Sequence, residues 1–198
     1  MVRAPRHAPA LISLMLAAGL GLNASATVPA SPSTAAPRAR EPVRSVSAVD
    51  LRRYAGLWVE IARIPNRFQR QCVRDSLALY TLRRDGTIEV LNQCRKRNGA
   101  VDQARGLARV SDRTSQAQLK VSLVSFLGWR PFWGDYWILG LDPDYDWAIV
   151  GEPNRRYGWI LARGQSLDSA SLATINAILE RNGYDIMEFQ PPLNNLTR

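Results

Sequence analysis

The chain has 198 residues, of which 46% are apolar and 22% are charged, and 26 Lys and Arg against 17 Asp and Glu give a net charge of +9. This composition is too apolar for general disorder, and the length predicts one domain, or two at most. His7 is the only histidine, and Cys72 and Cys94 are the only cysteines. If processing removes His7, no histidine remains for Ser-His-Asp or Cys-His catalysis or for a metal site, and two cysteines cannot form an all-cysteine zinc site.

The N-terminal segment has the pattern of an export signal. A basic start precedes an uncharged, mostly apolar run over residues 10–22, and Ala24-Ser25-Ala26 supplies the small residues of a signal peptidase site. The run is shorter than the roughly 20 residues that a membrane-spanning helix needs. We therefore predict a signal peptide over residues 1–26 and a protein in the periplasm or outside the cell. No cysteine follows the run at an acylation position, so no lipid anchor is expected.

Composition divides the remaining chain into three parts. Residues 27–47 are rich in Ala, Pro, Ser and Arg, have no apolar periodicity, and predict a disordered linker. The folded domain is expected over residues 48–190, followed by a loose tail over residues 191–198.

Short strands dominate the predicted domain. Residues 50–54 predict one helical turn that ends at Gly56, and pairs such as Asp85-Gly86 and Asn98-Gly99 mark hairpin turns. Eight strands, mostly linked by hairpins, favour an all-β, up-and-down antiparallel barrel. The predicted strands are residues 57–63, 73–83, 87–95, 103–110, 118–124, 135–141, 147–151 and 157–162.

One α-helix is expected after the strands. Ser166 or Asp168 can cap its start, and Gly183 fits its end. Apolar residues recur at helical spacing and predict one face that packs on the barrel wall. These residues are Leu172, Ile175 and Leu179. Residues 185–189 predict a short edge strand.

Three motifs in chain order resemble the signatures of the lipocalin family. Gly56-Leu57-Trp58 begins the first strand, residues 141–145 lie between strands six and seven, and residues 159–163 end strand eight. The resemblance covers residues 48–190 and is strongest to the bacterial lipocalin and apolipoprotein D branch. Residues 136–139, Tyr-Trp-Ile-Leu, are typical of that branch. Many bacterial relatives are outer-membrane lipoproteins, whereas this chain lacks the acylation cysteine.

The resemblance implies structural roles for three of these residues. Trp58 closes the bottom of the barrel, and Arg163 lies across its ring in a cation–π contact. Gly56 allows a tight backbone turn before the strand. These residues are therefore not counted among the ligand-binding residues.

The resemblance also implies a binding site inside the barrel. An eight-stranded barrel is just wide enough for one small ligand, and a mostly apolar and aromatic interior fits a lipid. The alternative is that the same side chains fill a solid core. The implied inward-facing residues are Tyr80, Asn92, Leu123, Tyr136, Ile149, Trp159 and Leu161.

The open end of such a barrel, here called the mouth, would collect alternate loops with a strong positive charge. The loops are residues 64–73, 95–101, 124–134 and 152–156. They hold eight basic residues, and only Glu152 opposes them. We hypothesise that arginines such as Arg67 and Arg97 bind an anionic head group while the acyl chain enters the barrel. The alternative is an ordinary solvated basic surface.

The third of these loops also carries four aromatic residues. Aromatic and basic residues together are common at membrane interfaces, so the loop predicts peripheral contact with a bilayer. A lid over the cavity is the alternative. The aromatic residues are Phe126, Trp129, Phe132 and Trp133.

Cys72 begins the second predicted strand and Cys94 ends the third. In an oxidising compartment, a disulfide is favoured over two free thiols. Strict hairpin pairing from Asp85-Gly86 offsets the two cysteines, so the disulfide requires a bulge or bend before the second strand. We predict a disulfide that fixes the mouth.

We therefore predict an exported lipocalin that carries a fatty acid, lysophospholipid or similar amphiphile, without a cofactor, in maintenance of the cell envelope. The alternative is a basic surface that binds acidic membranes or lipopolysaccharide without a cavity ligand. An enzyme is not expected, because acids such as Glu60 or Asp135 lack an accompanying base, nucleophile or metal cluster. Nucleic acid is not an expected partner of an exported chain without a recognition motif.

Overall fold

A computed structural model describes residues 41–125 and 127–192. The predicted signal peptide, most of the predicted linker, Phe126 and the last six residues lie outside these ranges. Among the described helices, none has the length and apolar character required to cross a membrane.

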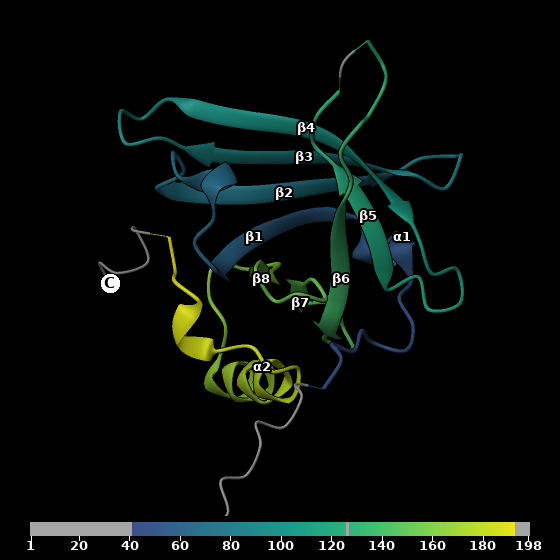
Figure 1. The fold of residues 1–198 in the computed structure, drawn as a ribbon. Coiled ribbons are helices and arrows are strands. Elements are labelled where there is room, and N and C mark those ends of the chain that lie inside the picture. Colours follow the sequence, from purple (N-terminus) through teal and green to yellow (C-terminus); the bar gives the residue numbers. More distant parts are fainter. Residues whose placement is uncertain (1–40, 126, 193–198) are drawn as a thin grey trace, which may run out of the picture. The chain divides into compact units, whose positions relative to one another are not determined.

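Eight strands form a closed antiparallel barrel in which each strand pairs with the next along the chain and β8 returns to β1 (Figure 1). The predicted architecture is therefore confirmed. The strands are β1 (Gly56–Arg63), β2 (Arg74–Leu82), β3 (Ile88–Arg95), β4 (Val101–Val110), β5 (Gln118–Ser122), β6 (Gly134–Leu141), β7 (Trp147–Gly151) and β8 (Gly158–Ala162).

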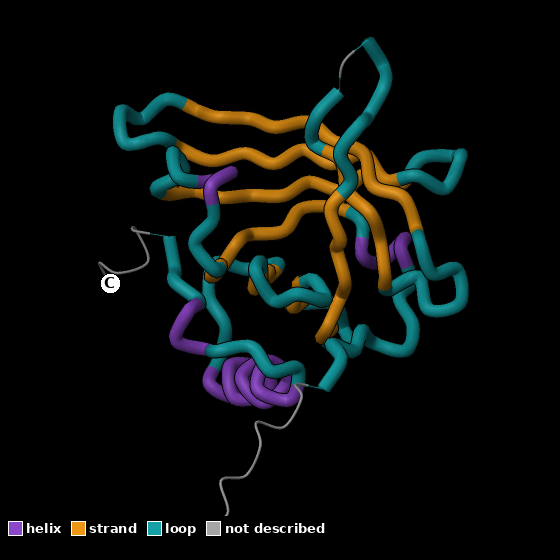
Figure 2. Tube along the Cα trace, in the orientation of Figure 1, coloured by secondary structure: helices purple, strands orange, loops and turns teal. Residues whose placement is uncertain are grey.

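The helix α2 (Ser169–Arg181) lies outside the barrel wall (Figure 2). Asp168 caps its start by accepting a hydrogen bond from the backbone N–H of Ser171. Ile175 and Leu179 are fully buried, whereas Leu172 is 40% exposed. The packed face of α2 thus begins one turn later than the apolar spacing predicts.

The segment after α2 differs from the sequence expectation of a strand over residues 185–189. Residues Ile186–Glu188 form the 3₁₀ helix η2, because the Asp185 side chain accepts a hydrogen bond from the backbone N–H of Met187 and caps the turn. Pairing with the sheet is limited there to one bridge between Gln190 and Arg63.

The barrel packs its apolar side chains in two layers. One cluster lies inside the barrel, and a second lies between the wall and α2. Every residue of β7 is buried, because its inner face contributes to the first cluster and its outer face to the second. Part of the predicted linker also packs: Val43 is buried, and the backbone N–H of Val46 donates to the carbonyl of Ile138.

Trp58 closes one end of the barrel, as the resemblance implies. Its ring is fully buried, and its indole N–H donates to the carbonyl of Tyr54 in the short helix α1 (Leu51–Tyr54). The Arg163 guanidinium lies 3.7 Å from the ring centroid and donates to backbone carbonyls that include those of Ala55 and Leu57. Trp58 and Arg163 therefore have the structural role expected for them.

Candidate ligand-binding site

The barrel contains a cavity of about 600 Å³. This volume lies within the range of about 300–1,000 Å³ that is typical of small-ligand sites. Its wall is mostly apolar and aromatic, with side chains such as Val90, Leu119 and Val150. The interior is therefore not a solid core.

Six of the seven predicted inward-facing residues line this cavity, because side chains alternate across each strand. They are Tyr80, Asn92, Leu123, Tyr136, Trp159 and Leu161.

Ile149 is the exception, and the prediction that it faces the cavity is wrong. It belongs to the cluster that packs under α2, whereas its neighbours Ala148 and Val150 belong to the inner cluster. A shift of one residue along a strand moves a side chain to the opposite face. Val150 lines the cavity in its place.

Arg67 and Arg97 do not line the cavity. Arg67 lies in the 3₁₀ helix η1 (Arg67–Gln69), with its guanidinium 4.9 Å from the centroid of the Phe68 ring. Arg97 is exposed in the turn between β3 and β4. Both arginines therefore belong to an outer rim of the mouth, and no contact places them beside a ligand inside the barrel.

Among the residues that the structure describes, the charged ones that line the cavity are all acidic: Glu60, Asp102, Asp135 and Glu152. Three of them have a cation within ion-pair distance. Glu60 pairs with Arg63, Asp102 with Lys96 at 2.8 Å, and Asp135 with Lys120 at 2.7 Å. Glu152 takes part in no ion pair among the described residues, so it is the one lining acid without a paired charge.

Three tyrosines form a polar patch at the closed end. The hydroxyls of Tyr54 and Tyr136 are 2.7 Å apart, and the Tyr136 hydroxyl donates to that of Tyr80 at 3.0 Å. Burial raises the pKa of Tyr80 to about 12 and raises the pKa values of Tyr54 and Tyr136 well above the ordinary value. The patch therefore stays neutral and can hydrogen-bond a polar group without adding charge.

Sequence reasoning did not assign Tyr54 to the site. Its position at the end of α1, against Trp58 with ring centroids 5.2 Å apart, places it on the cavity floor. Tyr54 lies four residues before Trp58, which the family resemblance places at the closed end of the barrel. That spacing could have placed Tyr54 near the cavity floor.

A second polar network crosses the wall near the mouth. The indole N–H of Trp159 donates to the side-chain oxygen of Gln69 at 2.9 Å, and the Gln69 amide donates to Glu60 at 2.7 Å. Arg63 joins Glu60 to the backbone carbonyl of Cys72. These bonds fix the Trp159 ring in the wall and connect it to the disulfide-bonded loop.

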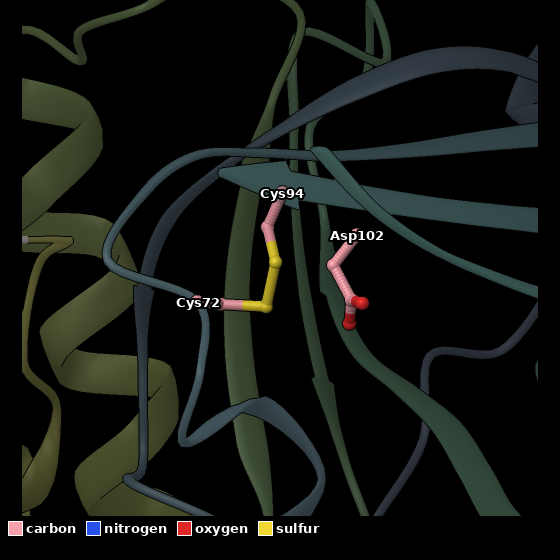
Figure 3. A group of neighbouring side chains, drawn as sticks. All are labelled: Cys72, Cys94 and Asp102. Atoms are coloured by element: carbon pink, nitrogen blue, oxygen red, sulfur yellow. A yellow bond between two sulfur atoms is a disulfide. The ribbon is translucent and has the colours of Figure 1, made fainter. Parts of the chain in front are cut away.

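The predicted disulfide between Cys72 and Cys94 is present, with a Cα–Cα distance of 5.4 Å (Figure 3). The register of β2 against β3 shifts between Arg74 and Leu77, so the irregularity lies within the first residues of β2 and not before the strand as predicted. Asp102 lies beside the disulfide, but it accepts hydrogen bonds from Lys96 and from Gln71, and its pKa is lowered, chiefly by Lys96. Because the two sulfurs are bonded to each other, neither is a thiolate that could bind a metal ion.

The aromatic loop of the mouth divides into exposed and half-buried rings. Trp129 is 67% exposed and Phe132 is 70% exposed. Trp133 is half-buried, with the Arg109 guanidinium 4.2 Å from its ring centroid. Phe132 and Trp133 also line the cavity, so this loop has both a face toward the ligand space and a face toward the outside.

A closed eight-stranded barrel with an apolar cavity that opens at one end is the architecture of a small-ligand binding protein. A family model described as a lipocalin-like domain matches residues 49–194. The chain belongs to the lipocalin family, within its bacterial lipocalin and apolipoprotein D branch.

Two relatives illustrate this membership, and one solved structure shares the fold. Temperature-induced lipocalin-1 of Arabidopsis thaliana is 40% identical over 144 residues, which cover 71% of this chain and 77% of that protein. Outer membrane lipoprotein Blc of Escherichia coli strain K12 is 37% identical over 152 residues, 75% of this chain and 82% of that protein. The fold is similar to that of insecticyanin from the tobacco hornworm Manduca sexta, with a TM-score of 0.62, 21% identity, and coverage of 76% and 83% of the two chains.

Proposed function

We propose that this lipocalin binds one single-chain amphiphile, a fatty acid or a lysophospholipid, and carries or sequesters it in the cell envelope. The apolar cavity of about 600 Å³ is the observation that supports this function. The alkyl chain would lie against side chains such as Val90 and Leu119, and burial of apolar surface would drive binding. The neutral tyrosine patch would accommodate a polar atom at the closed end.

Intrinsic fluorescence tests this function. The mature protein is titrated with a lysophospholipid and with a long-chain fatty acid, each below its micelle concentration. Trp159 lines the cavity, so saturable one-to-one binding should change its emission. A Trp159→Phe variant provides the control, because its emission change should fall to what Trp133 contributes while it still binds in a competition assay. If neither ligand gives a saturable response in either assay, the proposed function is wrong.

We propose binding rather than catalysis. The lining acids are held in ion pairs, except Glu152, and no nucleophile paired with a base lies among the described residues that line the cavity. Incubation with a lysophospholipid and analysis of the products by mass spectrometry should return the intact lipid. Release of free fatty acid at a rate proportional to protein concentration would contradict this proposal.

We also propose that the protein works outside the cytoplasm. The Cys72–Cys94 disulfide supports this location, because disulfides persist in oxidising compartments. Cell fractionation with N-terminal sequencing tests it: a protein that begins near residue 27 in the periplasmic or secreted fraction is the expected result, and an uncleaved cytoplasmic chain would contradict it.

A second proposal concerns membrane contact through the outside of the mouth. Leu127, Trp129 and Phe132 are 93%, 67% and 70% exposed, and exposed arginines such as Arg67 lie on the same rim. We propose that this rim docks on acidic bilayers to collect or deliver the ligand.

Co-sedimentation with vesicles that contain phosphatidylglycerol tests the docking proposal. Trp129→Ser should weaken sedimentation. When Arg67→Gln is added to that variant, sedimentation should weaken further and depend less on salt. Met187→Ser is the matched control, because Met187 is 85% exposed but lies in η2, outside the loops of the mouth. Equal sedimentation of the Trp129 variant and the wild type would reject docking through this rim.

A further inference from the structure

Glu152 lies at the mouth, and the Tyr184 side chain hydrogen-bonds its backbone from outside the barrel. Its N–H donates to the Tyr184 hydroxyl at 2.8 Å, and that hydroxyl donates to its carbonyl at 2.9 Å. This contact requires glycine at the preceding position, since a Cβ on Gly151 would lie 2.2 Å from the same hydroxyl. The side chain of Glu152 therefore occupies a defined position in the wall.

That side chain faces the cavity. Ala148 and Val150 belong to the inner cluster, and the alternation of the strand continues the inner face to Glu152. Glu152 lines the cavity and is only 7% exposed.

The Glu152 carboxylate lacks part of its hydrogen bonding. Its Oε1 atom is buried and accepts no hydrogen bond from the residues that the structure describes. A buried carboxylate oxygen without a partner is costly, and native structures normally satisfy such groups. Lys96 and Lys120 neutralise Asp102 and Asp135 on the same wall, but among residues 41–125 and 127–192 no cation lies within ion-pair distance of Glu152. A hydrogen-bond donor that enters the cavity would supply the partner that this oxygen lacks.

The chemistry of that group follows from its surroundings. A carboxylate only accepts hydrogen bonds, so the partner must be a donor. The exposed Arg156 favours ionisation of the Glu152 carboxyl group without forming an ion pair, and Asp135 disfavours it. The Asn154 side chain and the Arg156 backbone also hydrogen-bond this carboxyl group, so only its Oε1 atom remains without a partner among the described residues. No Lys or Arg side chain of the described part of the chain lines the cavity. A ligand carboxylate at this position would be repelled, whereas a cationic donor would supply both the hydrogen bond and the missing positive charge.

We propose that Glu152 binds the ammonium group of a single-chain amphiphile whose alkyl chain lies in the barrel. This inference rests on the proposed lipid-binding function and narrows it to ligands with an amine at the polar end. Glu152 then determines the specificity of the mouth, in the place of the arginines on its outer rim.

Three probes of equal chain length test the inference: dodecylammonium, dodecanoate and dodecanol, each titrated below its micelle concentration at about pH 8, where carboxyl groups are largely ionised. The wild type should bind dodecylammonium about tenfold or more tightly than dodecanoate. Because hydrogen bonds to charged groups are strong, Glu152→Gln should lower the affinity for dodecylammonium about 10- to 100-fold and leave dodecanol binding unchanged. Glu180→Gln is the matched control: it makes the same change at an exposed position on α2, outside the cavity, so the selectivity should be retained.

The outcomes separate this inference from the proposed function. If the wild type binds dodecanol but does not distinguish dodecylammonium from dodecanoate, the role of Glu152 is wrong and lipid binding stands. If Glu180→Gln lowers the ammonium affinity as much as Glu152→Gln, general electrostatics explains the selectivity and the specific contact is rejected. If none of the three probes binds, the proposed function itself fails.

Discussion

Removal of the disulfide should destabilise the domain by an amount that depends on the length of the loop between the two cysteines. Cys72 and Cys94 are 22 residues apart, and loop-closure entropy for a loop of this size is worth roughly 3 kcal/mol at 25 °C. Both cysteines are at least 90% buried, so serine at these positions would also bury two hydroxyls. We expect the Cys72→Ser, Cys94→Ser double variant to lose about 3 kcal/mol or more of unfolding free energy.

Urea denaturation followed by fluorescence measures this loss. Reduced wild type should match the double variant to within about 1 kcal/mol, and added reductant should leave the variant unchanged. Because the disulfide lies at the mouth and Arg63 donates to the carbonyl of Cys72, the variant should also release ligand faster. A double variant with the unfolding free energy of the oxidised wild type would refute the reasoning, because the bond would then constrain neither the unfolded chain nor the mouth.

Three further predictions concern the supports of the barrel and of Glu152. Arg163→Lys should cost about 2 kcal/mol in urea denaturation, because one ammonium cannot replace the several carbonyl contacts of the guanidinium and its stacking on Trp58; an unchanged midpoint would contradict this. Gly151→Ala should lower the thermal midpoint and the ammonium selectivity together, since the added Cβ displaces the Tyr184 hydroxyl from the Glu152 backbone; loss of stability with full selectivity would separate the two. Burial raises the pKa of Glu152, so the folded state binds its proton more tightly than the unfolded chain does. In the ligand-free protein, the stability that this proton adds is fully present below the pKa of Glu152 in the unfolded chain. It is lost as the pH rises through the pKa of Glu152 in the folded protein. The difference in unfolding free energy between wild type and Glu152→Gln should therefore change across that pH window, and a constant difference would reject the linkage.

Most of the fold could be predicted from the residues of the hairpin turns and from the alternation of side chains along the strands. Hairpin pairs such as Asp85-Gly86 fixed the strand order, because the residues of a tight turn specify which strands are neighbours. Strand ends were displaced by one or two residues, as for β4, which begins at Val101 and not at residue 103. The 3₁₀ turn at Ile186–Glu188 was missed, because the capping Asp185 competes locally with strand pairing.

In a barrel that a helix covers, the direction in which a strand's side chains point is harder to predict than the order of the strands. Apolar residues fill both faces of β7, so its composition does not distinguish the inner residue Val150 from the outer residue Ile149. The position of α2 decides which face of β7 points outward. The contact between α2 and β7 joins elements that are distant in the sequence. The tyrosine patch was missed for a similar reason, because Tyr54 reaches the cavity from a helical turn outside the strand pattern.

The charge of the site shows most clearly what the sequence could not provide. Counting charges by loop gives a basic mouth in which Glu152 is a minor exception, and that count favoured an anionic head group. The structure turns Arg67 and Arg97 outward and Glu152 inward, so the surface that a ligand would touch has the opposite sign to the loops that form it. A side chain contributes to recognition according to its burial and its partners, because solvent screens an exposed arginine far more than it screens a buried carboxylate. The residue that a tally of charges treats as an exception is therefore the one expected to select the ligand.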